Sequence, residues 1–237
     1  MKTLLLAAGF GTRLYPLNNQ KAKALIEYKG IPLINHILSK IPPDIPIIVN
    51  SNKKFESDFR SWQKTLDRDI TLCIEPVYEE KQALGAIGSI LYWIKEQNIS
   101  EDLLVVGTDN YFGFDLTDFI NNYDGKHALV AVHDIGDTSK ACHYGVVRVD
   151  GRRAIELEEK PARPKCSLIA TACYIFPKRI FPLLFSYCAE GKKDNLGGFV
   201  AYLIENDQVL THVFHEQWFD VGSVEIYKSI QNEPCGH

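Results

Sequence analysis

The stretch LLLAAGFGTRLYPL, residues 4–17, decides the fold that we expect for this chain. Its first residues, Leu4–Ala8, form a short apolar run of the kind that builds buried parallel strands. Gly9 and Gly11 follow, and without side chains they let backbone N–H groups approach oxygen atoms closely. Arg13 adds a planar fork of donors that suits phosphate. The stretch predicts a first strand that ends in an anion-binding loop, while a tight turn with a surface arginine fits the same residues.

Strand-length apolar runs alternate with helix-length segments through the first half of the chain. The expected strands are Lys2–Ala7, Ile45–Asn50, Ile70–Ile74, Leu103–Gly107 and Ala128–Val132. The expected helices are Pro32–Lys40, Lys54–Leu66, Leu84–Glu96 and Asp115–Asn122. This alternation predicts an α/β fold with a Rossmann-like, mainly parallel sheet flanked by helices.

The pattern changes after about residue 140. YGVVRVDGRRAIELEEKP, residues 144–161, is typical of two short strands joined at Asp150-Gly151. The segments that follow are a strand at Ile169–Phe176, a helix near Phe199–Glu205, a strand at Val209–Phe214 and a helix from Ser223. Since no Pro/Gly/Ser-rich linker separates the halves, we expect a single domain, 1–237, with a small antiparallel lobe.

Charge and apolar patterning exclude several classes of partner. The net charge of -4 gives no general attraction to nucleic acid or to anionic membranes. No apolar stretch approaches the roughly 20 residues that span a bilayer, and Leu4–Ala8 is shorter than a signal-peptide core. We therefore expect a cytoplasmic protein without nucleic-acid or membrane partners, and the sequence leaves a homo-oligomer open.

A second cation supports the phosphate interpretation of the loop. A dinucleotide-binding loop needs G-x-G-x-x-G, and Leu14 stands where the third glycine belongs. Lys23, ten residues after Arg13, is another side chain suited to phosphate. The pair of cations favours a phosphate site of a different kind.

Five segments of the chain resemble one family. LLLAAGFGTRLYPL with KAL at residues 23–25 is similar to the signature L-x-x-G-x-G-T-R-L/M-x-P-L-T, then P-K-P/A-L, of the sugar-1-phosphate nucleotidylyltransferases. Asn18 replaces the usual threonine of that signature, and Ala22 replaces the proline. The further segments, in the family's order, are EKQALGAIGSIL, LLVVGTDNYF, YGVVRVDG…LEEKP and WFDVGSVEIY. The resemblance is strongest to the short thymidylyl-, uridylyl- and guanylyltransferases, such as glucose-1-phosphate thymidylyltransferase.

This resemblance implies a nucleotide-diphospho-sugar transferase fold and a reaction of EC 2.7.7 type. A nucleoside monophosphate unit passes from a nucleoside triphosphate, with a slight preference for dTTP or UTP, to a sugar 1-phosphate, and pyrophosphate leaves. The implied cofactor is Mg²⁺. The resemblance divides the domain into a nucleotide-binding part, 1–140, and a sugar-binding part with C-terminal helices, 141–237.

The same resemblance assigns the site residues. It makes Asp109 and Asp220 the Mg²⁺ ligands, and two carboxylates with phosphate and water oxygens suit that ion. Arg13 and Lys23 neutralise the triphosphate and, with Asp109, are the expected catalytic residues. Glu80 reads the base. The expected nucleotide-binding residues are Leu6, Ala8, Gly9, Gly11, Thr12, Arg13, Lys23, Glu80, Gly85 and Asp109.

The sugar-phosphate end is expected at the hairpin and the EEKP segment that ends it. By the resemblance, Lys160 lies beside the phosphate of the sugar, Glu159 accepts hydrogen bonds from sugar hydroxyls, and the Gly145 backbone contacts the ring. An exposed charge run at a strand end is the ordinary interpretation of residues 158–160. The following Pro161 and the preceding hairpin favour a site.

Other functions remain open at this stage. A carboxylate at Glu80 suits guanine as well as thymine or uracil, so a guanylyltransferase fits. Phosphocholine cytidylyltransferases share KAL and a DN segment but lack EEKP. A glycosyltransferase needs a D-x-D motif at a strand end, whereas Asp67-Arg68-Asp69 precedes a strand. A regulatory relative that only binds nucleotide is disfavoured because both cations and both aspartates are present.

Overall fold

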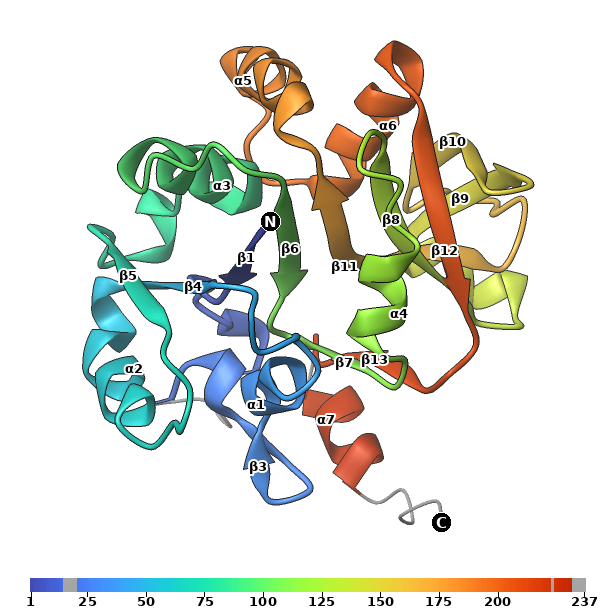
Figure 1. Ribbon diagram of the computed structural model, residues 1–237. Coiled ribbons are helices and arrows are strands. Elements are labelled where there is room, and N and C mark those ends of the chain that lie inside the picture. Colours follow the sequence, from blue (N-terminus) through green and yellow to red (C-terminus); the bar gives the residue numbers. More distant parts are fainter. Residues whose placement is uncertain (15–20, 223, 232–237) are drawn as a thin grey trace.

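A mixed sheet of nine strands forms the centre of the computed structural model, which describes residues 1–14, 21–222 and 224–231 (Figure 1). In spatial order the strands are β5 (Thr71–Glu75), β4 (Ile47–Asn52), β1 (Lys2–Leu6), β6 (Leu103–Gly107), β11 (Leu168–Phe176), β8 (Ala128–Asp134), β12 (Val209–Phe214), β10 (Arg153–Glu159) and β9 (Gly145–Asp150). The first four in this order are parallel to one another. Their carboxyl ends therefore meet at one edge of the sheet.

Helices cover both faces of this sheet. They are α1 (Leu33–Leu38), α2 (Glu56–Gln63), α3 (Gly85–Glu96), α4 (Leu116–Asn121), α5 (Phe181–Ala189) and α6 (Leu196–Asn206), whereas α7 (Val224–Gln231) packs in a separate, smaller cluster. Side chains of α3, α5 and α6 share one hydrophobic cluster with the sheet, and those of α1, α2 and α4 share the other. In the described residues no helix has the length and apolar character needed to cross a membrane.

Alternation along β1 shows how one strand serves both clusters. Leu4 packs in the cluster of α3, α5 and α6, while Leu5 packs in the opposite one, and both are fully buried. Successive side chains of a strand point to opposite faces, so a strand covered on both faces has to be apolar throughout. This explains the unbroken leucine run of the sequence.

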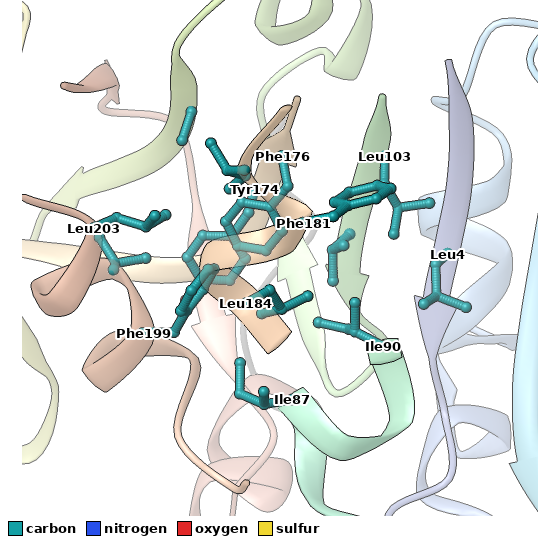
Figure 2. Close-up of a cluster of buried hydrophobic side chains, with 14 of the residues drawn as sticks. Leu4, Ile87, Ile90, Leu103, Tyr174, Phe176, Phe181, Leu184, Phe199 and Leu203 are labelled. Atoms are coloured by element: carbon teal, nitrogen blue, oxygen red, sulfur yellow. The ribbon is translucent and has the colours of Figure 1, made fainter. Parts of the chain in front are cut away.

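The first of these clusters is built around aromatic side chains of β11 (Figure 2). Tyr174 and Phe176 stack with ring centroids 5.5 Å apart. The ring of Phe199 from α6 meets Phe176 edge-on at 5.5 Å. Ile87 and Ile90 of α3 join the same cluster. The sheet and two helices from distant parts of the chain are thus fixed to each other by one apolar core.

The expected α/β class is confirmed, and the second half of the sheet is mixed. β11 runs antiparallel to both β6 and β8, because it follows a hairpin and not a helical crossover. The predicted hairpin is formed by β9 and β10, and β10 pairs with β12 at the Arg153–Leu210 register. The antiparallel lobe is therefore the continuation of the main sheet.

Two short sheets were not expected from the sequence. β2 (Glu27–Tyr28) pairs with β3 (Ile31–Pro32), and α7 is tied to this hairpin because Tyr227 Oη and Gln231 Nε2 donate to the Glu27 carbonyl. β7 (Asn110–Phe112) pairs with β13 (Trp218–Asp220) just beyond the end of β6 (Figure 1). The second pairing brings together two segments that lie about half the chain apart.

Candidate functional site

The glycine-rich loop leaves the sheet at the carboxyl end of β1. Gly11 has φ +62°, a left-handed conformation that favours glycine, and it allows the turn into the 3₁₀ helix Thr12–Leu14. The Leu14 N–H closes the turn by donating to the Gly11 carbonyl at 2.9 Å. Thr12 Oγ1 donates to Glu80 Oε1 at 3.0 Å, so the loop is joined to the 3₁₀ helix Glu80–Gln82.

Lys23 lies against both predicted metal ligands. It begins the 3₁₀ helix Lys23–Leu25, whose alanine and leucine are buried, and this leaves the lysine facing the sheet edge. Its Nζ lies 2.7 Å from Asp109 Oδ2 and 3.8 Å from Asp220 Oδ1. Burial acts to raise the pKa of the Asp109 carboxyl, but the Lys23 ammonium together with hydrogen bonds from Lys23, Asn110 and the backbone outweighs it, and the pKa falls below its ordinary value. The carboxylate is therefore held ionised.

The short β7–β13 sheet brings the two aspartates together. Asn110 of β7 stands opposite Asp220 of β13, and the Val221 N–H donates to the Asp109 carbonyl at 2.8 Å. Asn110 is 4% exposed, and its Nδ2 donates to Asp109 Oδ1 at 2.7 Å. Trp218 Nε1 donates to Asn110 Oδ1 at 3.0 Å. Asn110 thus orients the carboxylate, a role that the sequence prediction missed although the residue follows Asp109 directly.

Three cavities meet at this point. The inner cavity, about 260 Å³, lies between the glycine-rich loop and the start of α3 and reaches Glu75. The loop cavity, about 290 Å³, lies between the 3₁₀ helix Thr12–Leu14 and Asp220. The outer cavity, about 830 Å³, lies over β10 and the start of α6. Asp109 lines all three cavities.

The residues predicted for the site gather around these cavities. Those lining the inner cavity are Leu6, Ala8, Gly9, Lys23, Gly85 and Asp109. Those lining the loop cavity are Gly11, Thr12, Lys23, Glu80, Asp109 and Asp220. Those lining the outer cavity are Asp109, Gly145, Glu159, Lys160 and Asp220. Arg13 falls in the 3₁₀ helix Thr12–Leu14, and its side chain lies outside the described part of the chain.

Glu80 and the inner cavity are separate. Glu80 is exposed and lines the loop cavity, whereas the carboxylate in the wall of the inner cavity is Glu75, at the end of β5 and 2% exposed. Burial raises the pKa of Glu75 above its ordinary 4.5, although hydrogen bonds from Ser89 and Asn50 act in the opposite direction. The signal for Glu75 in the sequence was a glutamate directly after an apolar strand, and the sequence prediction did not include it.

The outer cavity is shaped around the Glu159 carboxylate. A Cβ added to Gly145 would lie 2.8 Å from Glu159 Oε2, and one added to Gly197 would lie 2.3 Å from it, so a side chain at either position would displace this carboxylate. Partial burial raises the pKa of Glu159, against the opposing effect of Lys160 and of a hydrogen bond with Asn195. Lys160 has φ +47°, a strained conformation for a lysine, of the kind found at functional sites. Its N–H donates to the Tyr144 carbonyl at 3.0 Å.

Known proteins share both the sequence and the fold. A Sulfolobus acidocaldarius protein provisionally named mannose-1-phosphate guanyltransferase is 28% identical over 98% of this chain, which spans 63% of that protein. The UTP–glucose-1-phosphate uridylyltransferase AglF of Haloferax volcanii is 26% identical over 95% of this chain and 93% of its own length. The bifunctional protein GlmU of Methanocaldococcus jannaschii is 29% identical, and this chain covers 51% of it.

The solved structure of a Bacillus anthracis protein provisionally named glucose-1-phosphate thymidylyltransferase superposes with a TM-score of 0.81, covering 100% of this chain and 98% of that chain at 22% identity. This likeness establishes the fold. The sequence profile described as nucleotidyl transferase matches residues 2–234, almost the whole chain. The chain is a member of the nucleotidyl transferase family.

Proposed function

We propose that this chain transfers a nucleoside monophosphate unit from a nucleoside triphosphate to a sugar 1-phosphate. An oxygen of the sugar phosphate attacks the α-phosphorus, the bond from that phosphorus to the β-bridging oxygen breaks, and pyrophosphate leaves with the electron pair. The names of the relatives support this reaction class. The Haloferax volcanii uridylyltransferase, which matches this chain over nearly its full length, supports UTP as the nucleotide, with dTTP as the nearest alternative.

The observation that carries this proposal is the meeting of three cavities at Asp109. A nucleoside in the inner cavity, its departing phosphates in the loop cavity and a sugar phosphate in the outer cavity would have the α-phosphorus and the attacking oxygen beside this carboxylate. Holding two reactants in contact supplies much of the rate enhancement in a displacement of this kind.

Different cationic side chains are proposed to neutralise the phosphates of the two substrates. Lys23, which is 16% exposed, lines the inner and loop cavities and is our proposed partner of the α-phosphoryl oxygens. Arg13 is proposed for the departing phosphates. Lys160 lines the outer cavity and is proposed for the sugar phosphate, with Glu159 accepting hydrogen bonds from sugar hydroxyls. These charges oppose the repulsion between two anionic substrates, and no covalent intermediate is required.

Asp109 and Asp220 are suited to a divalent cation such as Mg²⁺. The Asp109 carboxylate, from the turn between β6 and β7, and the Asp220 carboxylate, at the end of β13, already share the Lys23 ammonium, so the pair attracts positive charge. In the described ranges no group of three or more His, Cys, Asp or Glu side chains could hold a metal. Phosphate and water oxygens would complete the ligands, an arrangement that Mg²⁺ prefers. When bound, the ion supplies positive charge against the charge on the phosphoryl oxygens.

We propose that the base is selected at the Glu75 end of the inner cavity and that Glu80 instead orients Thr12. A carboxylate accepts a hydrogen bond from the N3–H of uracil or thymine and from the N1–H of guanine. Cytosine presents an acceptor nitrogen at that position. Opposed acceptors in a buried site cost about 1–3 kcal/mol, so CTP is expected to be disfavoured roughly 5- to 150-fold.

A screen for pyrophosphate release tests the proposed function. Each common nucleoside triphosphate is combined with a panel of sugar 1-phosphates and with phosphocholine, in the presence of Mg²⁺. We expect release with UTP or dTTP and at least one sugar 1-phosphate. Release only with CTP and phosphocholine, or with no pair at all, would contradict the proposal.

A further inference from the structure

We infer that Asn50 and Asn52 of β4 are positioning residues for the triphosphate, because they hold the first peptides of the glycine-rich loop in place. The inference rests on the proposed function, since it concerns how the loop binds phosphate. Neither asparagine is assigned a role by the motifs of the sequence.

The two asparagines extend the sheet beyond the end of β1. Leu6, the last residue of β1, stands opposite Asn50, and β4 continues to Asn52. Beyond Leu6, the chain that follows β1 is hydrogen-bonded by side chains of β4 and no longer by the β4 backbone. Asn50 Oδ1 accepts the Ala7 N–H at 2.7 Å, and Asn52 Nδ2 donates to the Ala8 carbonyl at 2.8 Å. Both asparagines are fully buried, so water does not compete for these bonds.

Each amide is fixed in one orientation by a second partner. Asn50 Nδ2 donates to Glu75 Oε1 at 2.7 Å, and Asn52 Oδ1 accepts the Phe55 N–H at 3.2 Å. A flipped Asn50 would set its carbonyl against the Glu75 carboxylate and its amino group against the Ala7 N–H. An amide, which both donates and accepts, satisfies the two sides at once, whereas a carboxylate of the same shape does not. Glu75 therefore acts on the loop through Asn50.

The opposite neighbour of β1 holds the same point of the chain. Thr108, which follows β6, donates from Oγ1 to the Leu6 carbonyl at 2.8 Å. The loop thus leaves the sheet from a segment held on both sides. Residues that are ordered before phosphate arrives need not be ordered on binding, which saves about 1–2 kcal/mol of conformational entropy for each residue. Backbone donors fixed in advance also stabilise charge better than mobile ones.

Isothermal titration of the full chain with inorganic tripolyphosphate and Mg²⁺ tests this inference, because that probe carries no base. Asn52→Asp keeps an acceptor for the Phe55 N–H but sets a carboxylate against the Ala8 carbonyl. We expect the dissociation constant for tripolyphosphate to rise about 10-fold. The KM for the sugar 1-phosphate should not change. Asn35→Asp is the matched control, since Asn35 also offers Oδ1 to a buried donor, the Trp62 indole, on a different element. It should bind tripolyphosphate as the wild type does.

A rescue experiment separates positioning from mere loss of stability. Asn50→Asp keeps the acceptor for the Ala7 N–H but faces the Glu75 carboxylate, and we expect at least about a 10-fold loss of tripolyphosphate affinity. Adding Glu75→Gln supplies an amino group that donates to the new carboxylate. The tripolyphosphate affinity of the double variant should lie within about 3-fold of the affinity of Glu75→Gln alone.

Two results would overturn the inference. In the first, Asn52→Asp and Asn50→Asp bind tripolyphosphate as tightly as the wild type does. In the second, the double variant binds tripolyphosphate as weakly as Asn50→Asp does. If the wild type releases pyrophosphate normally, either result removes the positioning role alone. A wild type that neither binds tripolyphosphate nor releases pyrophosphate would remove the proposed function as well.

Discussion

At the scale of single residues, the site depends on side chains that each contact more than one polar partner. Lys23 contacts two carboxylates from strands far apart in the chain. Asp109 accepts from Lys23 on one oxygen and from Asn110 on the other. A substitution here therefore alters several interactions together, and variants have to preserve shape if charge alone is to be tested.

Asp109→Asn and Asp220→Asn test the acidic pair, because each removes one negative charge at nearly constant volume. Losing a charged contact in a partly buried site costs about 1.5–3 kcal/mol, and a lost metal ligand costs more, so we expect kcat to fall by at least about 100-fold. The readout is kcat from pyrophosphate release, with thermal unfolding as the check on folding. Excess EDTA should likewise abolish wild-type turnover. Either variant working at the wild-type rate would contradict the assignment.

Lys160→Ala tests the division of labour between cations. The lysine lines the outer cavity and not the inner one, so its loss should raise KM for the sugar 1-phosphate roughly 10- to 150-fold. KM for the nucleotide should stay within about 3-fold, since that substrate is proposed to bind elsewhere. Lys165→Ala, which removes an exposed lysine paired with Glu156, is the control. Equal effects on both substrates would show that Lys160 lies between them.

Glu75 makes folding stability depend on pH. Its pKa is raised above 4.5 in the folded chain, so the folded state retains a proton that the unfolded state has released. The stabilisation is fully present below pH 4.5 and is lost as pH rises through the raised pKa. The free energy of unfolding of Glu75→Gln, measured from pH 4 to about 8, should therefore increase relative to that of the wild type as pH rises. A difference between Glu75→Gln and the wild type that does not change with pH would refute the effect.

At the scale of elements, the sequence predicts helices and strands that are long enough to show a periodic or apolar pattern, and it misses the very short strands. Apolar runs predict the long strands, and three- and four-residue spacing predicts α3. β7 and β13 have three residues each, too few for any periodicity, and their pairing depends on tertiary contacts such as the Trp218–Asn110 hydrogen bond across 108 residues. The resemblance could predict that both aspartates belong to the site, but not the sheet that joins them.

The connection between β5 and α3 bears on the prediction that Glu80 reads the base. That prediction took Glu80 because it lies five residues before Gly85 in the segment that resembles the family. In the structure β5 ends at Glu75, and the connection contains the extra 3₁₀ helix Glu80–Gln82. Sequence spacing carries no measure of how this connection folds back, so it could not show that Glu75 lines the inner cavity while Glu80 lines the loop cavity.

Gly85→Ala tests how α3 begins. Gly85 has φ +74°, and a Cβ there would lie 2.1 Å from Asp194 Oδ1 and 2.5 Å from the Lys193 carbonyl. The left-handed backbone alone costs an alanine about 1–2 kcal/mol, so we expect the free energy of unfolding to fall by at least about 2 kcal/mol. Gly88→Ala, in the same helix without a positive φ, should change it by no more than about 1 kcal/mol. Equal melting temperatures for the two variants would contradict the strain at Gly85.

At the scale of the whole molecule, the sheet separates two hydrophobic clusters. The inner and outer cavities lie at different parts of its carboxyl edge and share Asp109. Under the proposed function, two substrates would therefore be held at once, each in its own cavity.

Steady-state kinetics test this arrangement. If both substrates bind before chemistry, plots of reciprocal rate against reciprocal nucleotide concentration should intersect when the sugar 1-phosphate is varied. A chain that first kept the nucleotidyl group covalently would release pyrophosphate alone and give parallel lines. Exchange of labelled pyrophosphate into the nucleotide without any sugar phosphate would likewise contradict direct displacement.

The pairing of β13 with β7 has a consequence for the chain while it is being made. The ribosome releases the glycine-rich loop, Lys23 and Asp109 early, and synthesis has to pass Asp220 before the acidic pair exists. An interrupted product of 200 residues would carry the predicted nucleotide-binding residues but only half of the acidic pair. Under the proposed function, a chain that has not yet reached β13 would therefore lack one of the two proposed metal ligands and is not expected to transfer nucleotide.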